Sequence, residues 1–183
     1  MTTDKINPNK NEAYDAIVTR TSVRQYLNDA PVPEVLVEAL LRAAMSAPTA
    51  VNSQPWAFVV VNDRDVLDRL GAALPYARML SRAPLAIVSC GVGDKFLSGD
   101  DEPLWVQDLS AASENILIAA NAFGLGAVWT SVFPHADREK TVRDILGLPA
   151  DIYPLNVIVV GRPARKQQPR DKWNPDAVHY NHW

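Results

Sequence analysis

The chain has 183 residues, of which 48% are hydrophobic and 21% are charged. This length and balance are typical of a single globular domain with enough chain to bury a sizeable core. The formal net charge is -3, and the basic residues form no stripe, so nucleic acid is not expected as a partner.

The cysteine content and the apolar runs indicate where the protein works. Cys90 is the only cysteine, which excludes an intrachain disulfide and favours a reducing compartment, so the cytoplasm is expected. Residues 1–16 lack the apolar core of a signal peptide. No apolar run approaches the roughly 20 residues of a membrane span, so no membrane association is expected. Cys90 itself lies in a strand-like run, which favours a buried core residue over a nucleophile.

Helical and strand patterns alternate along the chain. Apolar residues at helical spacing predict helices over about 11–20, 34–44, 63–74 (capped by Asn62 or Asp63), 104–123 and 136–146. Short β-branched runs predict strands over 56–61, 85–90, 127–130 and 155–160. Gly124 and Gly147 are expected to end the helices that precede them. The pattern predicts an α+β fold in one domain, residues 1–183, with a small mixed sheet flanked by helices.

The last stretch, about residues 162–183, breaks this pattern. Three prolines interrupt it, and it carries Trp173 and Trp183. Because such aromatic residues are costly to leave in water, we expect this tail to pack over a neighbouring subunit.

Arg20-Thr21-Ser22-Val23-Arg24 is the first stretch that could carry chemistry. In an extended segment the side chains of Arg20, Ser22 and Arg24 point to one side. Two guanidinium groups and a hydroxyl suit a phosphate monoester, because arginine binds phosphate oxygens through two parallel hydrogen bonds. Taken alone, the stretch is better explained by a pair of arginines on a solvated edge, because short motifs match by chance.

A second polar cluster runs from Ala47 to Trp56 between a helix and a strand. Thr49, Asn52, Ser53 and Gln54 offer donors and acceptors that suit the polar edge of a planar ring. The alternative is a capped connection whose amides satisfy backbone groups.

Other motifs point away from specialised sites. Gly124-Leu125-Gly126 lies between a helix and a strand, the wrong order for a dinucleotide fingerprint, and Gly91-Val92-Gly93 lacks the third glycine. No dedicated NAD(P) cradle is therefore predicted. His179 and His182 have metal-pair spacing but no third ligand nearby, so packing is favoured over a metal.

The order of these segments resembles the nitroreductase family. The resemblance rests on the motifs Arg20-x-Ser22-x-Arg24, Ser46-Ala47-Pro48-Thr49-x-x-Asn52-Ser53-Gln54-Pro55-Trp56, Gly124-Leu125-Gly126-x-x-Trp129 and Gly161-Arg162-Pro163-Ala164. Residues Asp108, Ala111, Ala112, Asn115, Ile116 and Leu117 of the long helix agree with it. It spans the chain from about Tyr14 to Trp183.

The resemblance implies a nitroreductase-like fold, an intertwined homodimer with an extended C-terminal arm, and two FMN molecules at the subunit interface. Arg20, Ser22 and Arg24 would hold the FMN phosphate and ribityl chain, with Thr21 contributing backbone contact. Many relatives have a second arginine or a histidine at the position of Thr21. The implied flavin contacts from the other subunit are Pro48, Thr49, Ala50, Asn52 and Gln54. Those beside the pyrimidine and N5 side of the ring are Trp129, Thr130 and Ser131. In the tail they are Arg170 and Lys172, with Arg162 as an alternative.

The implied activity is reduction of a small oxidised substrate (a nitroaromatic, quinone or flavin) by NAD(P)H. NAD(P)H would give a hydride to flavin N5 and leave before the oxidant takes its place, a ping-pong scheme in which the flavin carries the chemistry and no side chain acts as an essential base. Alternatives are a specialised flavoenzyme (a dehalogenase, enone reductase or flavin-cleaving oxidase), a flavin-binding or redox-sensing module without turnover, and a structural dimer without flavin.

The region between Gly91 and Trp105 is expected to influence substrate choice. Phe96 and Trp105 could cover the flavin, or could equally be core or interface aromatics.

Overall fold

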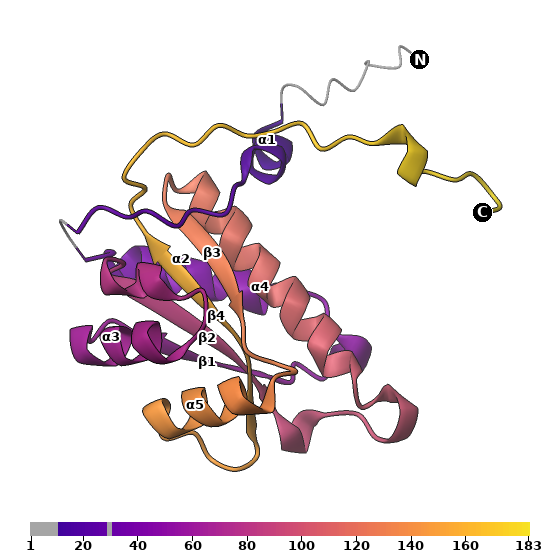
Figure 1. The fold of residues 1–183 in the computed structure, drawn as a ribbon. Helices are drawn as coiled ribbons and strands as arrows, with labels where there is room; N and C mark the ends of the chain where they lie inside the picture. The colour runs from indigo at the N-terminus through magenta and orange to yellow at the C-terminus, as the bar shows by residue number, and fades with distance from the viewer. Residues whose placement is uncertain (1–10, 29–30) are drawn as a thin grey trace.

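The computed structural model describes residues 11–28 and 31–183. Most of residues 1–16, where no signal peptide is expected, therefore lies outside the described residues. Four strands form one sheet in the order β1-β2-β4-β3 (Figure 1). The strands are β1 (Trp56–Val61), β2 (Leu85–Val92), β3 (Gly126–Ser131) and β4 (Ile152–Gly161). The helices are α1 (Glu12–Thr19), α2 (Glu34–Met45), α3 (Arg64–Ala73), α4 (Leu104–Ala122) and α5 (Ala136–Leu146).

The predicted α+β class is confirmed, and most elements match their predicted bounds within one or two residues. Strand β4 begins three residues earlier than expected, at Ile152. The expectation of a mixed sheet is wrong, because every pairing among the four strands is antiparallel. A helix between two strands is compatible with either direction, and β4, the last strand in sequence, inserts between β2 and β3 and pairs antiparallel with both. The only parallel contact in the described chain is an isolated bridge between Ser22 and Ala127.

The sheet is buried on both faces, which explains why its central strands are almost entirely apolar. Along β2, Leu85 and Ile87 face α2 and α4, whereas Ala86 and Val88 face α3 and α5. Helix α1 contacts α4 but buries none of its own side chains fully. None of the described helices is long and apolar enough to cross a membrane.

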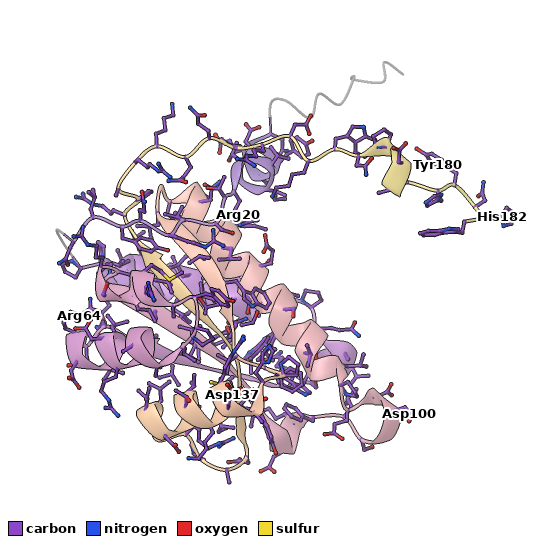
Figure 2. All side chains as sticks on the ribbon, in the orientation of Figure 1. Arg20, Arg64, Asp100, Asp137, Tyr180 and His182 are labelled. Carbon is purple, nitrogen blue, oxygen red and sulfur yellow. The ribbon has the colours of Figure 1, made fainter. Side chains whose placement is uncertain are left out.

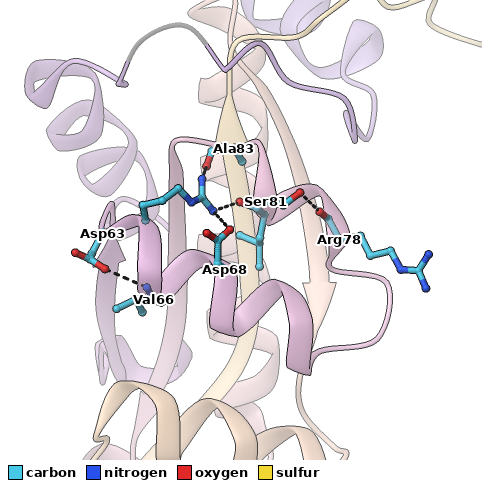
Figure 3. Close-up of polar contacts among 8 residues, drawn as sticks. Asp63, Val66, Asp68, Arg78, Ser81 and Ala83 are labelled. Carbon is cyan, nitrogen blue, oxygen red and sulfur yellow. Dashed lines mark hydrogen bonds and ion pairs between the residues drawn. The ribbon is translucent and has the colours of Figure 1, made fainter.

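Helix α3 holds the segment that follows it in place (Figure 3). Asp63 caps the helix by accepting a hydrogen bond from the Val66 N–H at 3.0 Å. Arg64 pairs with Asp68 at 2.9 Å and donates to the carbonyl oxygens of Ala83, at 3.0 Å, and Leu80. The short 3-10 turn η3 (Arg78–Ser81) is thereby tied to α3, and the Arg78 side chain points away from the helix.

Candidate functional site

The segment from Arg20 to Arg24 is extended and lies along the outer edge of β3. The Val23 N–H donates to the Ala127 carbonyl oxygen at 3.0 Å. Val23 is buried, whereas Ser22 and Arg24 on either side of it are exposed. A Cβ at Gly126 would lie 2.7 Å from Val23, so only glycine lets the segment approach the strand this closely.

Tyr26 fixes the far end of this segment. Its hydroxyl donates to the Val23 carbonyl oxygen at 2.6 Å and lies 3.1 Å from that of Val159. Burial raises the pKa of this phenol, so it stays neutral and remains a donor. Two backbone hydrogen bonds join its neighbours to the start of the tail, from Leu27 to Arg162 and from Ala164 to Gln25, both at 2.9 Å. These bonds hold the end of the arginine segment beside the start of the tail.

A basic cavity of about 800 Å³ lies between this segment and the tail. Six of its lining residues are cations, and no carboxylate of the described chain is among its lining residues. Figure 2 shows Arg20 beneath the tail. The lining residues are Arg20, Thr21, Ser22, Arg24, Arg165, Lys166, Gln167, Gln168, Arg170 and Lys172. The structure thus brings together the predicted phosphate contacts of both segments, although Arg170 and Lys172 lie about 150 residues after Arg20.

Arg20 is oriented by an ion pair with α4. Its Nε atom lies 3.0 Å from Glu114 Oε1, and the Arg20 side chain is only 19% exposed. This contact runs through Nε, and the guanidinium carries further N–H donors on its two terminal nitrogens that suit another acceptor. The ion pair holds Arg20 in the cavity wall rather than removing it from the site.

Trp129, Thr130 and Ser131 lie on an edge strand next to the basic cavity. They line a smaller cavity of about 180 Å³, to which Arg24 and Tyr76 also contribute. Because backbone groups alternate along an antiparallel strand, the N–H and C=O of Trp129 point to the open edge, as those of Ala127 and Ser131 do. Arg24 lines both cavities and connects them.

The segment from Pro48 to Gln54 lies elsewhere, at the start of α4. The Ala50 N–H donates to Oδ1 of the buried Asp108 at 3.0 Å. Arg20 pairs six residues further along the same helix, at Glu114, which places it about 9 Å further along the axis. The structure does not bring Pro48, Thr49, Ala50, Asn52 or Gln54 into the basic cavity of the same chain.

The backbone of this segment is strained. Val51, Asn52 and Gln54 have φ angles of 46°, 59° and 47°, in the left-handed region that β-branched residues such as valine rarely adopt. The Gln54 side chain donates to Asn52 Oδ1 at 3.0 Å, and the Gln54 N–H donates to Thr49 Oγ1 at 3.1 Å. These two bonds agree with the interpretation of the segment as a capped connection. The backbone strain agrees with the other interpretation, because strain of this kind concentrates at binding sites.

Phe96 and Trp105 belong to the core rather than to an open surface of this chain. Their rings stack at 4.9 Å and 6°, and Tyr153 lies 5.5 Å from Phe96. Trp105 is buried, and a Cβ at Gly91 would lie within 2.9 Å of both rings. Of the two interpretations left open by the sequence, the structure favours core aromatics.

The remaining candidate residues have structural surroundings. Gly124 ends α4 with φ 72°, so the GxG motif serves a helix end and the close approach of Val23. Cys90 is buried, and burial raises the pKa of its thiol to about 12. His179 stacks on Trp183 at 4.3 Å, and the described residues contain no group of three His, Cys, Asp or Glu that could hold a metal.

Sequence and structure comparisons agree with one another. The model of the nitroreductase family matches residues 17–75 and 72–162. A candidate NADH dehydrogenase/NAD(P)H nitroreductase of Methanothermobacter thermautotrophicus is 42% identical over 95% of this chain and 89% of its own. A crystal structure with the same description from Bacteroides thetaiotaomicron has TM-score 0.89 at 47% identity, covering 94% of this chain and 99% of that one. A candidate nitroreductase from Desulfovibrio desulfuricans, solved with FMN, has TM-score 0.80 at 26% identity over 95% and 99% of the two chains.

Proposed function

The chain belongs to the nitroreductase family, and on this basis we propose that it is an FMN-dependent oxidoreductase that uses NAD(P)H to reduce small oxidised substrates. The observation that carries the proposal is the basic cavity, whose chemistry is that of a phosphate site. Six cations without a carboxylate in the wall suit a doubly charged phosphate, and Ser22 adds a hydroxyl donor. FMN ends in such a group, so the residues present fit the cofactor.

The remaining contacts follow from the position of this cavity. If Arg20, Ser22, Arg170 and Lys172 hold the phosphate, the residues at the open edge of β3 would be the ones next to it that could hold the isoalloxazine ring. There the Trp129 N–H and C=O offer one donor and one acceptor to its polar edge. FMN supplies a ring that takes a hydride from NAD(P)H and passes the electrons to the substrate, which we propose occurs in turn at the same face.

Arg24 has a second role in this proposal. It lines both the basic cavity and the cavity at the β3 edge, so its charge would be close to both the phosphate and the ring of a bound FMN. Reduction adds negative charge to the ring, and a fixed cation nearby stabilises that state. Arg24 would therefore stabilise the reduced state of the bound cofactor as well as help to hold it.

We propose further that two chains complete each site. The tail runs past α1 and away from the rest of the chain (Figure 1), and its aromatic residues are exposed, Trp173 by 71% and Tyr180 by 83%. Tyr14, Ile17 and Val18 form an exposed apolar stripe on α1. A second copy covers these surfaces and brings its own Pro48–Gln54 segment to the flavin, because that segment cannot reach the basic cavity of its own chain. A reducing location with a supply of NAD(P)H, the cytoplasm, fits this proposal.

The test is the absorption spectrum of the purified protein. We expect a yellow protein with about one FMN per chain, which bleaches when NADH or NADPH is added and recovers with a nitroaromatic compound or a quinone. A protein that takes up no FMN would refute the proposal. Bound FMN without NAD(P)H turnover, whichever acceptor is added, would instead indicate a flavin-binding module without catalysis.

A further inference from the structure

A separate cavity of about 430 Å³ adjoins Arg24. It is lined by three arginine side chains, Arg24, Arg78 and Arg82, together with Gln25, and no carboxylate of the described chain is among its lining residues. It shares only Arg24 with the basic cavity, so the two are distinct concentrations of positive charge.

The placement of Arg78 and Arg82 follows from the turn that carries them. Ala77, Leu80 and Ala83, spaced three residues apart, are fully buried and form the inner side of the turn. Arg78 and Arg82 therefore lie on its outer side, where both are exposed. The contacts of Arg64 with the backbone of this turn fix it against α3 (Figure 3), so the two guanidinium groups project from a rigid support.

The charges around this cavity are unbalanced. Arg64 pairs with Asp68, but Arg24, Arg78 and Arg82 form no ion pair with any carboxylate of the described chain. Like charges that line one cavity repel each other, and a multivalent anion between them removes that cost. Guanidinium forks match phosphate oxygens in geometry, so a phosphate group is the anion best suited to the cavity.

The position of the cavity indicates which phosphate it binds. In the proposed function the flavin phosphate has its own six-cation site, while Arg24 and Met79 line both this cavity and the one at the β3 edge. An anion bound in this cavity therefore belongs to a molecule other than FMN, one that also contacts the flavin ring. We propose that Arg78 and Arg82, with Arg24, bind a phosphate group of the nicotinamide nucleotide donor. This inference rests on the proposed function, and it supplies the nucleotide contact that no glycine motif of the chain provides.

Arg82→Gln is the variant that tests the inference, because Arg82 lines this cavity and none of the others described above. Three electron donors are compared, namely NADPH, NADH and 1-benzyl-1,4-dihydronicotinamide, which has no phosphate. We expect the KM for the nucleotides to rise about tenfold, the size of one charge-assisted hydrogen bond, with kcat unchanged. Turnover with the phosphate-free donor and the affinity for FMN stay at wild-type values.

A binding measurement without turnover accompanies the kinetics. Calorimetric titration of the oxidised protein with NADP+ and NAD+ should show the same tenfold loss, and the difference should shrink at high salt. A larger loss for NADP+ identifies the 2′-phosphate, and equal losses identify the pyrophosphate; both support the site. Arg69→Gln on α3, an exposed arginine outside these cavities, is the matched control for the change in net charge and should alter none of these values.

Equal losses with all three donors, or no loss with the nucleotides, would overturn the donor-phosphate site. A wild-type protein that oxidises none of the three donors would instead overturn the proposed function, so the two failures are distinguishable. Arg82→Lys, which keeps the charge and loses the fork, should lie between wild type and Arg82→Gln.

Discussion

The arginine segment, Arg20 to Arg24, and the Pro48–Gln54 segment are both expected to contact one flavin, yet they differ in almost every structural respect. The first is extended along an edge strand, fixed by Tyr26 and Glu114, and its charges converge on a cavity within one chain. The second is anchored by Asp108 to the start of α4, and three of its residues have left-handed backbone. The first segment brings its cations to one cavity, whereas the second lines no part of that cavity.

This difference assigns separate tasks to the two segments. In the proposed site the arginine segment supplies charge, which acts over several ångströms and tolerates small displacements. In the same proposal the Pro48–Gln54 segment supplies shape and directed amides, which require a fixed backbone, and its left-handed φ angles are the cost of that geometry. Affinity for FMN should therefore depend mainly on the first segment, and the fit of the ring on the second.

The largest effect is expected from removing charge from the arginine segment. Arg20→Ala combined with Arg24→Ala deletes two charge-assisted contacts of about 1.5–3 kcal/mol each, so FMN affinity should fall by at least about 100-fold. Fluorescence titration of apoprotein with FMN measures this loss. The control pair Arg42→Ala with Arg69→Ala, exposed arginines on α2 and α3, removes equal charge and should bind FMN normally. Similar affinities for the two double variants would show that the basic cavity is not the phosphate site.

An intermediate effect is expected from the tail. In the proposed dimer it packs on the partner chain, so that the Pro48–Gln54 segment of one chain lies near the arginine segment of the other. Trp173→Ala combined with Trp183→Ala removes two exposed aromatic side chains of the kind enriched in interfaces, each worth about 1 kcal/mol. Sedimentation velocity should show dimer dissociation at concentrations at least tenfold higher than for wild type.

The matched control lies in the same tail. Arg170→Gln combined with Lys172→Gln should lower FMN affinity but leave the dimer intact, because these side chains line the cavity. If the tryptophan variant remained as dimeric as wild type, the tail would have no role in holding two chains together.

The smallest effect concerns the strained backbone of the second segment. Val51→Gly removes a β-branched side chain from left-handed geometry, which relieves about 1–2 kcal/mol and costs about 0.5–1 kcal/mol in chain entropy. The free energy of unfolding in urea should therefore stay constant or rise by up to about 1.5 kcal/mol. Val35→Gly, at a similarly exposed position in helical geometry, should lower it by about 0.5 kcal/mol. A Val51→Gly protein less stable than Val35→Gly would argue that the strain is absent in solution.

Local pattern was sufficient to predict much of this chain. The bounds of β1 and α5 coincide with the predicted ranges, because periodicity and end signals act within a few residues. The exposed Ser22 and Arg24 on either side of buried Val23 also follow from a two-residue period. Tyr26, Arg78 and Arg82 were missed. No spacing marks them, since they matter through a hydroxyl that reaches Val159 and through a turn fixed by Arg64.

By itself, the sequence determined the elements, their order and the kinds of group available for phosphate binding, because these depend on neighbouring residues. Only the tertiary structure decided that β4 inserts between β2 and β3, that all four strands are antiparallel, and that Arg170 and Lys172 face Arg20 across one cavity. It also separated Pro48–Gln54 from that cavity. These outcomes depend on which surfaces bury one another across more than a hundred residues, and no local pattern carries that information.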